Sequence, residues 1–189
     1  FIGAWIARQS DRLGIPRARE AWYLESTSQV MHARKAAQEV RETLDRRAFN
    51  GEALMHEASE VLREATAWST GSGLTDRFLM LAERSLERDD FLRAAVLACE
   101  AAKLVAYRES GGDRSKHGHE EREKGAAAIR ERRSKIPAAC FRRARQIRNA
   151  VAHGTLPGDG GTFTGGQEQL RSRLLDLINA TRAAADAAP

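Results

Sequence analysis

Apolar residues recur through most of the chain at spacings of three and four, and no stretch alternates apolar and polar residues over the length of a strand. This spacing predicts helices throughout, and the high content of alanine, arginine, glutamate and leucine favours the same structure. The expected helices cover residues 3–14, about 16–49, 52–68, 75–88, 91–108, about 121–134, 137–153 and about 167–187. We therefore expect an all-α fold, a helical bundle of about 6–8 helices.

The predicted helix Phe91–Arg108 is apolar on nearly all sides, and Glu100 and Lys103 are its polar interruptions. A helix that is apolar most of the way round lies at the centre of its bundle. Asp89 or Asp90 is expected to cap its first turn. Glu100 is expected to be a partly buried acid that pairs with Lys103, one turn further on, or with an arginine of a neighbouring helix.

The predicted helix over residues 16–49 carries an apolar seam with heptad-like spacing. Its members are Val30, Ala33, Ala37, Val40 and Leu44. The seam is short and rich in alanine, so packing on other helices of the chain is one use, and pairing with a second copy is the alternative. The flexible segment Ser69–Gly73 marks a boundary between N-terminal helices, residues 1–70, and a helical domain, residues 71–189.

The formal net charge of +5 is compatible with a polyanionic partner but does not identify one. No apolar run approaches the length that spans a bilayer, so no membrane partner is expected. Cys99 and Cys140 fall inside predicted helices without a metal ligand at suitable spacing, which is typical of reduced thiols in a cytoplasmic protein. Because the chain begins at Phe1 rather than Met, we expect a fragment whose missing N-terminal part could carry regulation.

The stretch Cys140–Thr155 is the part of the chain with the most suggestive chemistry. Its apolar stripe consists of Cys140, Ala144, Ile147 and Val151, and Gly154 is the residue expected just past the helix end. Arg148 and His153 are five residues apart, which places them roughly 140° and about 7.5 Å of rise from each other on a helix. One copy would therefore grip a phosphate poorly, whereas two copies that meet at a symmetric interface could do so.

The tract around this stretch is strongly basic. Its cationic members are Arg130, Arg132, Arg133, Lys135, Arg142, Arg143 and Arg145. Such a tract is usually a solvated face, and a solvated arginine with a helix-end histidine is the simplest interpretation of Arg148 and His153. A tract of this kind also attracts a phosphate backbone.

The motif Arg148-Asn149-x-x-x-His153-Gly154 resembles that of HEPN domains, a helical family of which many members are metal-independent ribonucleases. Residues 81–100, a helix followed by an acidic turn and an alanine-rich helix with an acidic residue, are also similar to that family. The resemblance covers about residues 74–187, and within the family the layout looks most like the effector half of CRISPR-associated CARF–HEPN ribonucleases. Toxin–antitoxin HEPN proteins are the other comparison, and both imply prokaryotic defence.

The resemblance implies a homodimer that cleaves single-stranded RNA at a composite site, leaving a 2′,3′-cyclic phosphate and a 5′-hydroxyl. In it His153 would transfer the proton, Arg148 would hold phosphate charge, and Asn149 would orient His153 or the phosphate. Arg142 and Arg145 would contact the RNA substrate, and Glu100 could position Arg148. The cyclic oligoadenylate sensor of CARF–HEPN proteins has no counterpart in this sequence, so a regulatory domain of that kind is expected to be missing from the chain.

No cofactor or metal is expected, because His117 and His119 lack a third ligand at suitable spacing. Two other functions remain open. A HEPN-like helical module could bind RNA, a nucleotide or a protein without cleaving, and a purely structural oligomer could form on the seam of residues 30–44.

Overall fold

The computed structural model describes residues 13–15, 17–26, 30–46, 53–70, 73–113, 115–153 and 166–187, with backbone alone for residues 26, 53–55 and 153. This part of the chain is all-helical, as predicted, and contains eight α-helices and one short 3-10 helix. It divides into two compact units, Phe1–Ser72 and Gly73–Pro189. Most of the helix predicted over residues 3–14, including Trp5 and Ile6, lies outside the described residues, and residues 13 and 14 form a turn.

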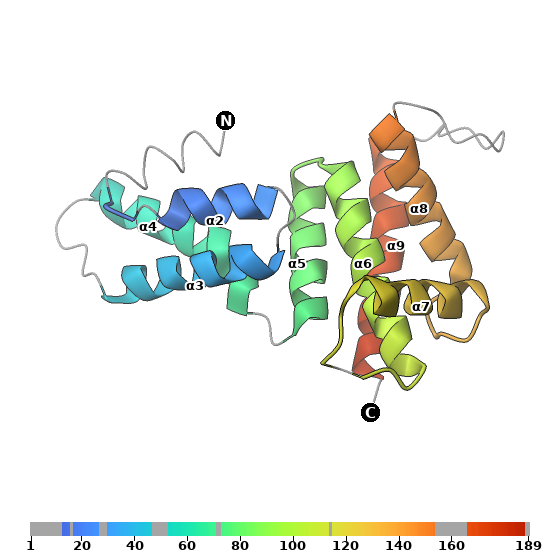
Figure 1. The fold of residues 1–189 in the computed structure, drawn as a ribbon. Coiled ribbons are helices and arrows are strands. Elements are labelled where there is room, and N and C mark those ends of the chain that lie inside the picture. The colour runs from blue at the N-terminus through green and yellow to red at the C-terminus, as the bar shows by residue number, and fades with distance from the viewer. Residues whose placement is uncertain are drawn as a thin grey trace. The chain divides into compact units, whose positions relative to one another are not determined.

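The N-terminal unit contains helices α2 (Arg17–Ser26), α3 (Val30–Arg46) and α4 (Ala53–Thr66), followed by the 3-10 helix η1 (Ala67–Thr70). α2 and α3 pack against each other, and α3 also contacts α4 (Figure 1). The single helix predicted over residues 16–49 is thus two helices. α2 ends at Ser26, and Thr27 and Ser28 follow in the sequence. Serine and threonine are weak helix formers because their side chains compete for backbone hydrogen bonds.

The apolar seam on α3 is buried inside this N-terminal unit. Val30 is 3% exposed, and Ala33, Ala37, Val40 and Leu44 are fully buried. The seam therefore packs on other helices of its own chain, as one of the two interpretations predicted. Because it is already covered, it offers no surface for the oligomer proposed as the structural alternative.

The C-terminal unit contains five helices. They are α5 (Leu74–Glu87), α6 (Phe91–Glu109), α7 (His119–Arg130), α8 (Ala138–His153) and α9 (Gly166–Asp186). α6 contacts α5, α7, α8 and α9, so it is the central helix that its composition predicts. The Asp90 side chain caps α6 by accepting a hydrogen bond from the backbone N–H of Arg93 (3.1 Å).

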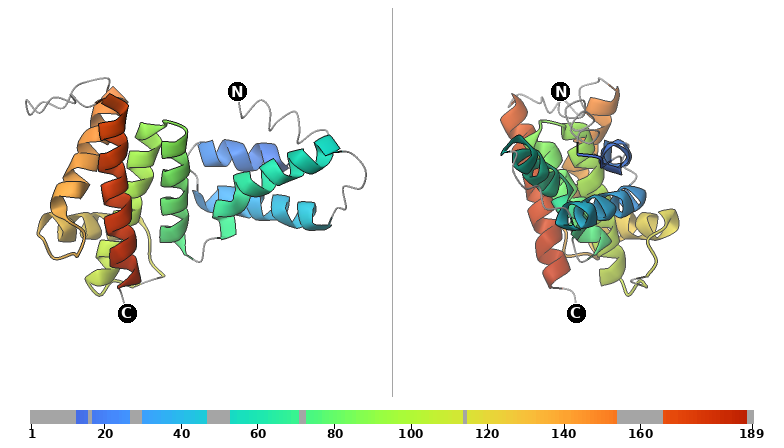
Figure 2. Two further views of the ribbon diagram at one scale, coloured as in Figure 1. Left: turned by 180° about the vertical axis from the view of Figure 1, so that it is seen from behind. Right: turned by 90° about the vertical axis from the view of Figure 1, so that its left-hand side faces the viewer.

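Helix α7 runs across α6, whereas α8 and α9 lie alongside it (Figures 1 and 2). The crossing is close at Gly125, where a Cβ atom would lie 1.9 Å from the backbone oxygen of Lys103. Only glycine lets the two backbones approach this closely. This contact fixes where the end of α7 meets α8.

Candidate active site on helix α8

The start of α8 is held by the last residue of α6. Glu109 Oε2 accepts hydrogen bonds from Ser134 Oγ (2.5 Å) and from the backbone N–H of Lys135 (3.2 Å). Ser134 Oγ in turn accepts from the backbone N–H of Ile136, which is buried just before the helix begins. These bonds tie the connection between α7 and α8 to the centre of the unit.

One face of α8 packs on the core. Phe141, Ala144 and Ile147 are buried, and Cys140 is half-buried. Val151, the last member of the predicted apolar stripe, is 43% exposed. The stripe therefore anchors the middle of α8 but leaves an apolar residue uncovered near the helix end, three residues after Arg148.

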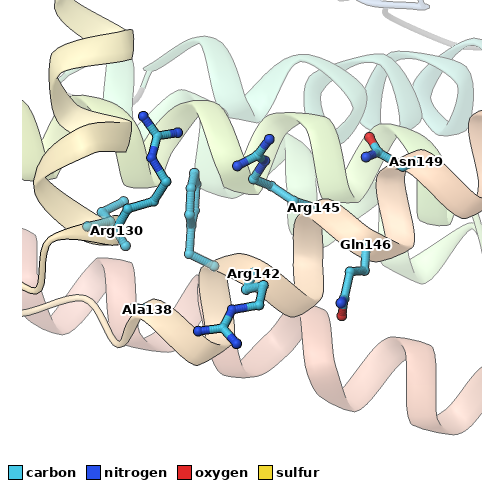
Figure 3. A pocket seen from close by; sticks show the side chains of 8 residues that line it. Arg130, Ala138, Arg142, Arg145, Gln146 and Asn149 are labelled. Atoms are coloured by element: carbon cyan, nitrogen blue, oxygen red, sulfur yellow. The ribbon is translucent and has the colours of Figure 1, made fainter. Parts of the chain in front are cut away.

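The adjacent face of α8 lines a pocket of about 420 Å³, closed on one side by the end of α7 (Figure 3). The pocket is lined by Ile129, Arg130, Ala138, Phe141, Arg142, Arg145, Gln146 and Asn149. The six lining residues of α8 follow spacings of three and one in turn, which is the repeat of a single helical face. In the view of Figure 3, Arg130 and Arg145 extend towards the upper edge of this face, whereas Arg142 and Gln146 extend towards its lower edge.

The pocket is positively charged. Arg130, Arg142 and Arg145 line it together, and no acidic residue does. None of these three guanidinium groups forms an ion pair with a residue that the structure describes. Arginine without a carboxylate partner presents its fixed fork of donors to a ligand anion, and phosphate is the anion that this fork fits well.

Arg148 lies next to the pocket and is held by its neighbour in the helix. Its Nε and Nη2 atoms donate hydrogen bonds to Asn149 Oδ1, at 3.1 and 2.8 Å. Arg148 is half-buried beside the buried Cys99 of α6, where its charge opposes the burial that raises the pKa of the Cys99 thiol to about 12. Asn149 thus contacts Arg148, and its oxygen is already used there.

His153 is the last residue of α8, and its side chain lies outside the described residues. It comes four residues after Asn149, so its backbone position continues the helical face that lines the pocket. The predicted site residues Arg142, Arg145, Asn149 and His153 therefore share one face of α8. Arg148 is at the border between this face and the core face.

Glu100 does not contact Arg148 through any hydrogen bond or ion pair that the structure records. Its Oε1 atom lies 2.8 Å from Lys103 Nζ, and its Oε2 atom lies 3.1 Å from Arg122 Nη1 on α7. Lys103 also lies 3.4 Å from Glu123. The acid thus holds α7 on α6, as the predicted pairing with Lys103 or a neighbouring arginine requires.

A metal site is not formed by the residues that the structure describes, since they contain no group of three or more His, Cys, Asp or Glu able to hold an ion. His117 Nδ1 lies 2.9 Å from the backbone oxygen of Ser115, and His119 opens α7. Within the same part of the chain, no helix is both long and apolar enough to cross a membrane.

No protein-family model, curated protein or solved structure matches the chain.

Two polar residues of the pocket, Arg130 and Gln146, were not predicted as site residues. Arg130 belongs to the basic tract, but only the crossing of α7 over α6 brings it beside α8, and no spacing in the sequence shows this. Gln146 lies four residues after Arg142, and this helical spacing could have revealed it.

Proposed function

We propose that the chain is a metal-independent endoribonuclease of the HEPN type, which cleaves single-stranded RNA with Arg148 and His153. The observation that carries the proposal is the Arg148–Asn149 pair at the end of the basic face of α8. This face carries arginines that can bind phosphate, and His153 follows in the same helix. RNA cleavage without metal requires both a cation for the phosphate and a group that transfers a proton.

In the proposed reaction the 2′-hydroxyl oxygen of RNA attacks the adjacent phosphorus, and the bond from phosphorus to the 5′-oxygen breaks. The 2′-hydroxyl loses a proton and the leaving 5′-oxygen gains one, and His153 carries this proton from one oxygen to the other, because imidazole titrates near neutral pH. Arg148 stabilises the negative charge that develops on the nonbridging oxygens. The products are a 2′,3′-cyclic phosphate and a 5′-hydroxyl. The nucleophile is the 2′-hydroxyl of the RNA itself, so the step consumes no water.

We place this site at a homodimer interface. The positions of Arg148 and His153 differ by roughly 140° around one helix, so one copy supplies only part of a phosphate site. A two-fold partner would bring its His153 to Arg148 and its Arg148 to His153, so that a dimer would hold two such sites. Val151 supports this arrangement, because it lies between the two residues in sequence and is an exposed apolar side chain that a partner could cover.

The resemblance to HEPN domains also suggests what the protein does in the cell. We infer a role in prokaryotic defence of the CRISPR or toxin type, in the cytoplasm, with a regulatory domain or a cyclic oligoadenylate sensor supplied outside the present sequence. Addition of cyclic oligoadenylate to a longer chain that contains such a domain would test this part.

The test of the enzymatic proposal is cleavage of single-stranded RNA in the presence of EDTA by purified wild-type protein, His153→Ala and Arg148→Ala. Each variant should keep its helical circular dichroism and its size in light scattering. Loss of either residue should lower the rate by about 100-fold or more. Arg143→Ala is the matched control, because Arg143 is exposed on the same helix and does not line the pocket.

Cleavage that is undiminished in either His153→Ala or Arg148→Ala would end the catalytic assignment. The second function is an RNA-binding module that does not cleave. A separate observation favours it: the pocket arginines have no ion pair within the described part of the chain, and they need no histidine to hold RNA. Tight RNA binding by a wild-type protein that leaves the RNA intact would support this second function.

A further inference from the structure

The pocket between α7 and α8 begins at the N-terminal end of α8 and runs along the helix towards Arg148 and His153, the proposed cleavage residues. Its arginine-bearing part spans Arg142 and Arg145 on α8 and is completed by Arg130 from the end of α7. Arg142 precedes His153 by eleven residues, which corresponds to about 16 Å along the helix. Arg145, however, precedes Arg148 by only three residues, or about 4.5 Å of rise. Because a stacked nucleic-acid strand advances about 3.4 Å per nucleotide, this part begins about one nucleotide from Arg148 and extends away from it along α8.

The size and the lining of the pocket suit a nucleotide. A volume of about 420 Å³ falls within the range of small-molecule sites. The buried side chains of Ile129 and Phe141 form an apolar part of its wall, and the amides of Gln146 and Asn149 lie towards the end nearest His153. Guanidinium donors can bind a phosphate, and the apolar wall and the amides beside them can contact the attached sugar.

The charge arrangement favours a phosphodiester strand. Arg130 and Arg145 come from different helices and extend to the same side, so they can grip one phosphate together (Figure 3). Arg142 extends towards the other edge of the same face, where an adjacent phosphate of the same strand would meet it. Cations distributed along a groove track a polyanion better than they enclose a single anion.

We propose that the α7–α8 pocket is a subsite that holds a ribose phosphate of the RNA strand away from the scissile phosphate, with Arg130 and Arg145 as its phosphate ligands. The identity of the ligand rests on the proposed ribonuclease function. The geometry assigns to Arg130 a role in substrate binding that its helix alone does not suggest.

The experiment measures binding separately from cleavage. A short fluorescein-labelled oligouridylate with 2′-O-methyl groups cannot be cleaved, because its 2′-oxygen carries no proton. Its Kd is measured by fluorescence anisotropy at several salt concentrations for the wild-type chain, Arg130→Gln and Arg145→Gln. Arg143→Gln is the matched control, since it removes the same charge from an exposed position of α8 outside the pocket.

Arg130→Gln and Arg145→Gln should each weaken binding by about 10-fold, the effect of losing a charged hydrogen bond. Each should also lower the slope of log Kd against log salt by about 0.7, the value for one phosphate contact on a single strand. Arg143→Gln should change the Kd by about twofold at most, because it loses only long-range attraction.

Equal effects of Arg130→Gln and Arg143→Gln would overturn the subsite, because a diffuse charge effect would then explain the binding. Displacement of the oligonucleotide by an equal concentration of uridine monophosphate would also overturn it, because the pocket would then hold a free nucleotide. Failure of the ribonuclease proposal looks different: binding would depend on Arg130 and Arg145, but an unmodified oligouridylate would stay intact.

Discussion

The guanidinium of Arg148 donates two hydrogen bonds to the side-chain oxygen of Asn149, the next residue of α8, at 3.1 and 2.8 Å. Side chains of consecutive helical residues diverge by about 100°, so Arg148 must bend around the helix to reach Asn149. The pair therefore holds the Arg148 guanidinium against Asn149, which is a residue of the pocket lining. Asn149 was predicted to orient His153 or the phosphate, and the structure gives its oxygen a different partner.

We predict that Asn149→Ala lowers the kcat/KM for RNA cleavage about fivefold, because Arg148 loses an acceptor worth about 1 kcal/mol and samples other orientations. The measurement is single-turnover cleavage of labelled RNA. Asn179→Ala is the matched control, because Asn179 is an exposed asparagine of α9 outside the pocket. An Asn149→Ala protein with the wild-type rate would show that the pair has no part in catalysis.

Glu100 provides a second prediction, since its contacts are structural. Glu100→Gln leaves Lys103 and Arg122 without their shared carboxylate, which should lower the free energy of unfolding of the C-terminal unit by about 1 kcal/mol, allowing for partial exposure. The kcat of the folded protein should not change. Glu87→Gln, at an exposed position of α5, is the control.

The optical probe matters for this measurement. Trp5, Trp22 and Trp68 all precede Gly73, so tryptophan fluorescence reports on the N-terminal unit. Urea unfolding must therefore be followed by far-ultraviolet circular dichroism, and the fluorescence transition should stay where it is in the wild type. A lower kcat with unchanged stability would instead make Glu100 a positioning residue for Arg148.

The third prediction concerns the two thiols. Burial raises the pKa of Cys99 from 9.0 to about 12, whereas Cys140 is half-buried on α8. A disulfide reagent at neutral pH should therefore modify Cys140 in the native protein and Cys99 only after denaturation. Rapid modification of Cys99 in the native state would contradict the packing of α6 against α8.

The same shift has a consequence for stability. Because the folded pKa of Cys99 is raised, the unfolded chain releases this proton first as pH rises. The contribution of the protonated Cys99 thiol to the free energy of unfolding is complete below pH 9.0 and decreases as pH increases towards about 12. Cys99→Ala should reduce the alkaline loss of stability, as measured by urea unfolding at neutral and alkaline pH.

Much of the fold follows from local sequence rules. The apolar character of Phe91–Arg108 predicted the central helix, and the carboxylate at Asp90 predicted its cap. The break between α2 and α3 was missed, because the apolar spacing of residues 16–49 outweighed the weak helix formers Ser26, Thr27 and Ser28. Periodicity detects a buried face well but detects a turn between two such faces poorly.

The pocket depends on tertiary contacts that periodicity does not contain. The spacing of residues 138–149 shows that Arg142 and Arg145 share a face, but Arg130 joins them only because Gly125 lets α7 cross close to α6. The sequence also did not predict that Val151 is exposed. Apolar spacing gives the direction of a side chain, but it does not show whether another helix covers that turn.

The most direct measurement of the proposed composite site is complementation between two inactive variants. Arg148→Ala and His153→Ala proteins, unfolded together and refolded, would form mixed dimers in which one site keeps an intact Arg148 from one protomer and an intact His153 from its partner. RNA cleavage with EDTA present should then recover to about a quarter of the wild-type rate, because half of the dimers are mixed and each has one complete site. A mixture as inactive as its separate components would contradict a site shared between two chains.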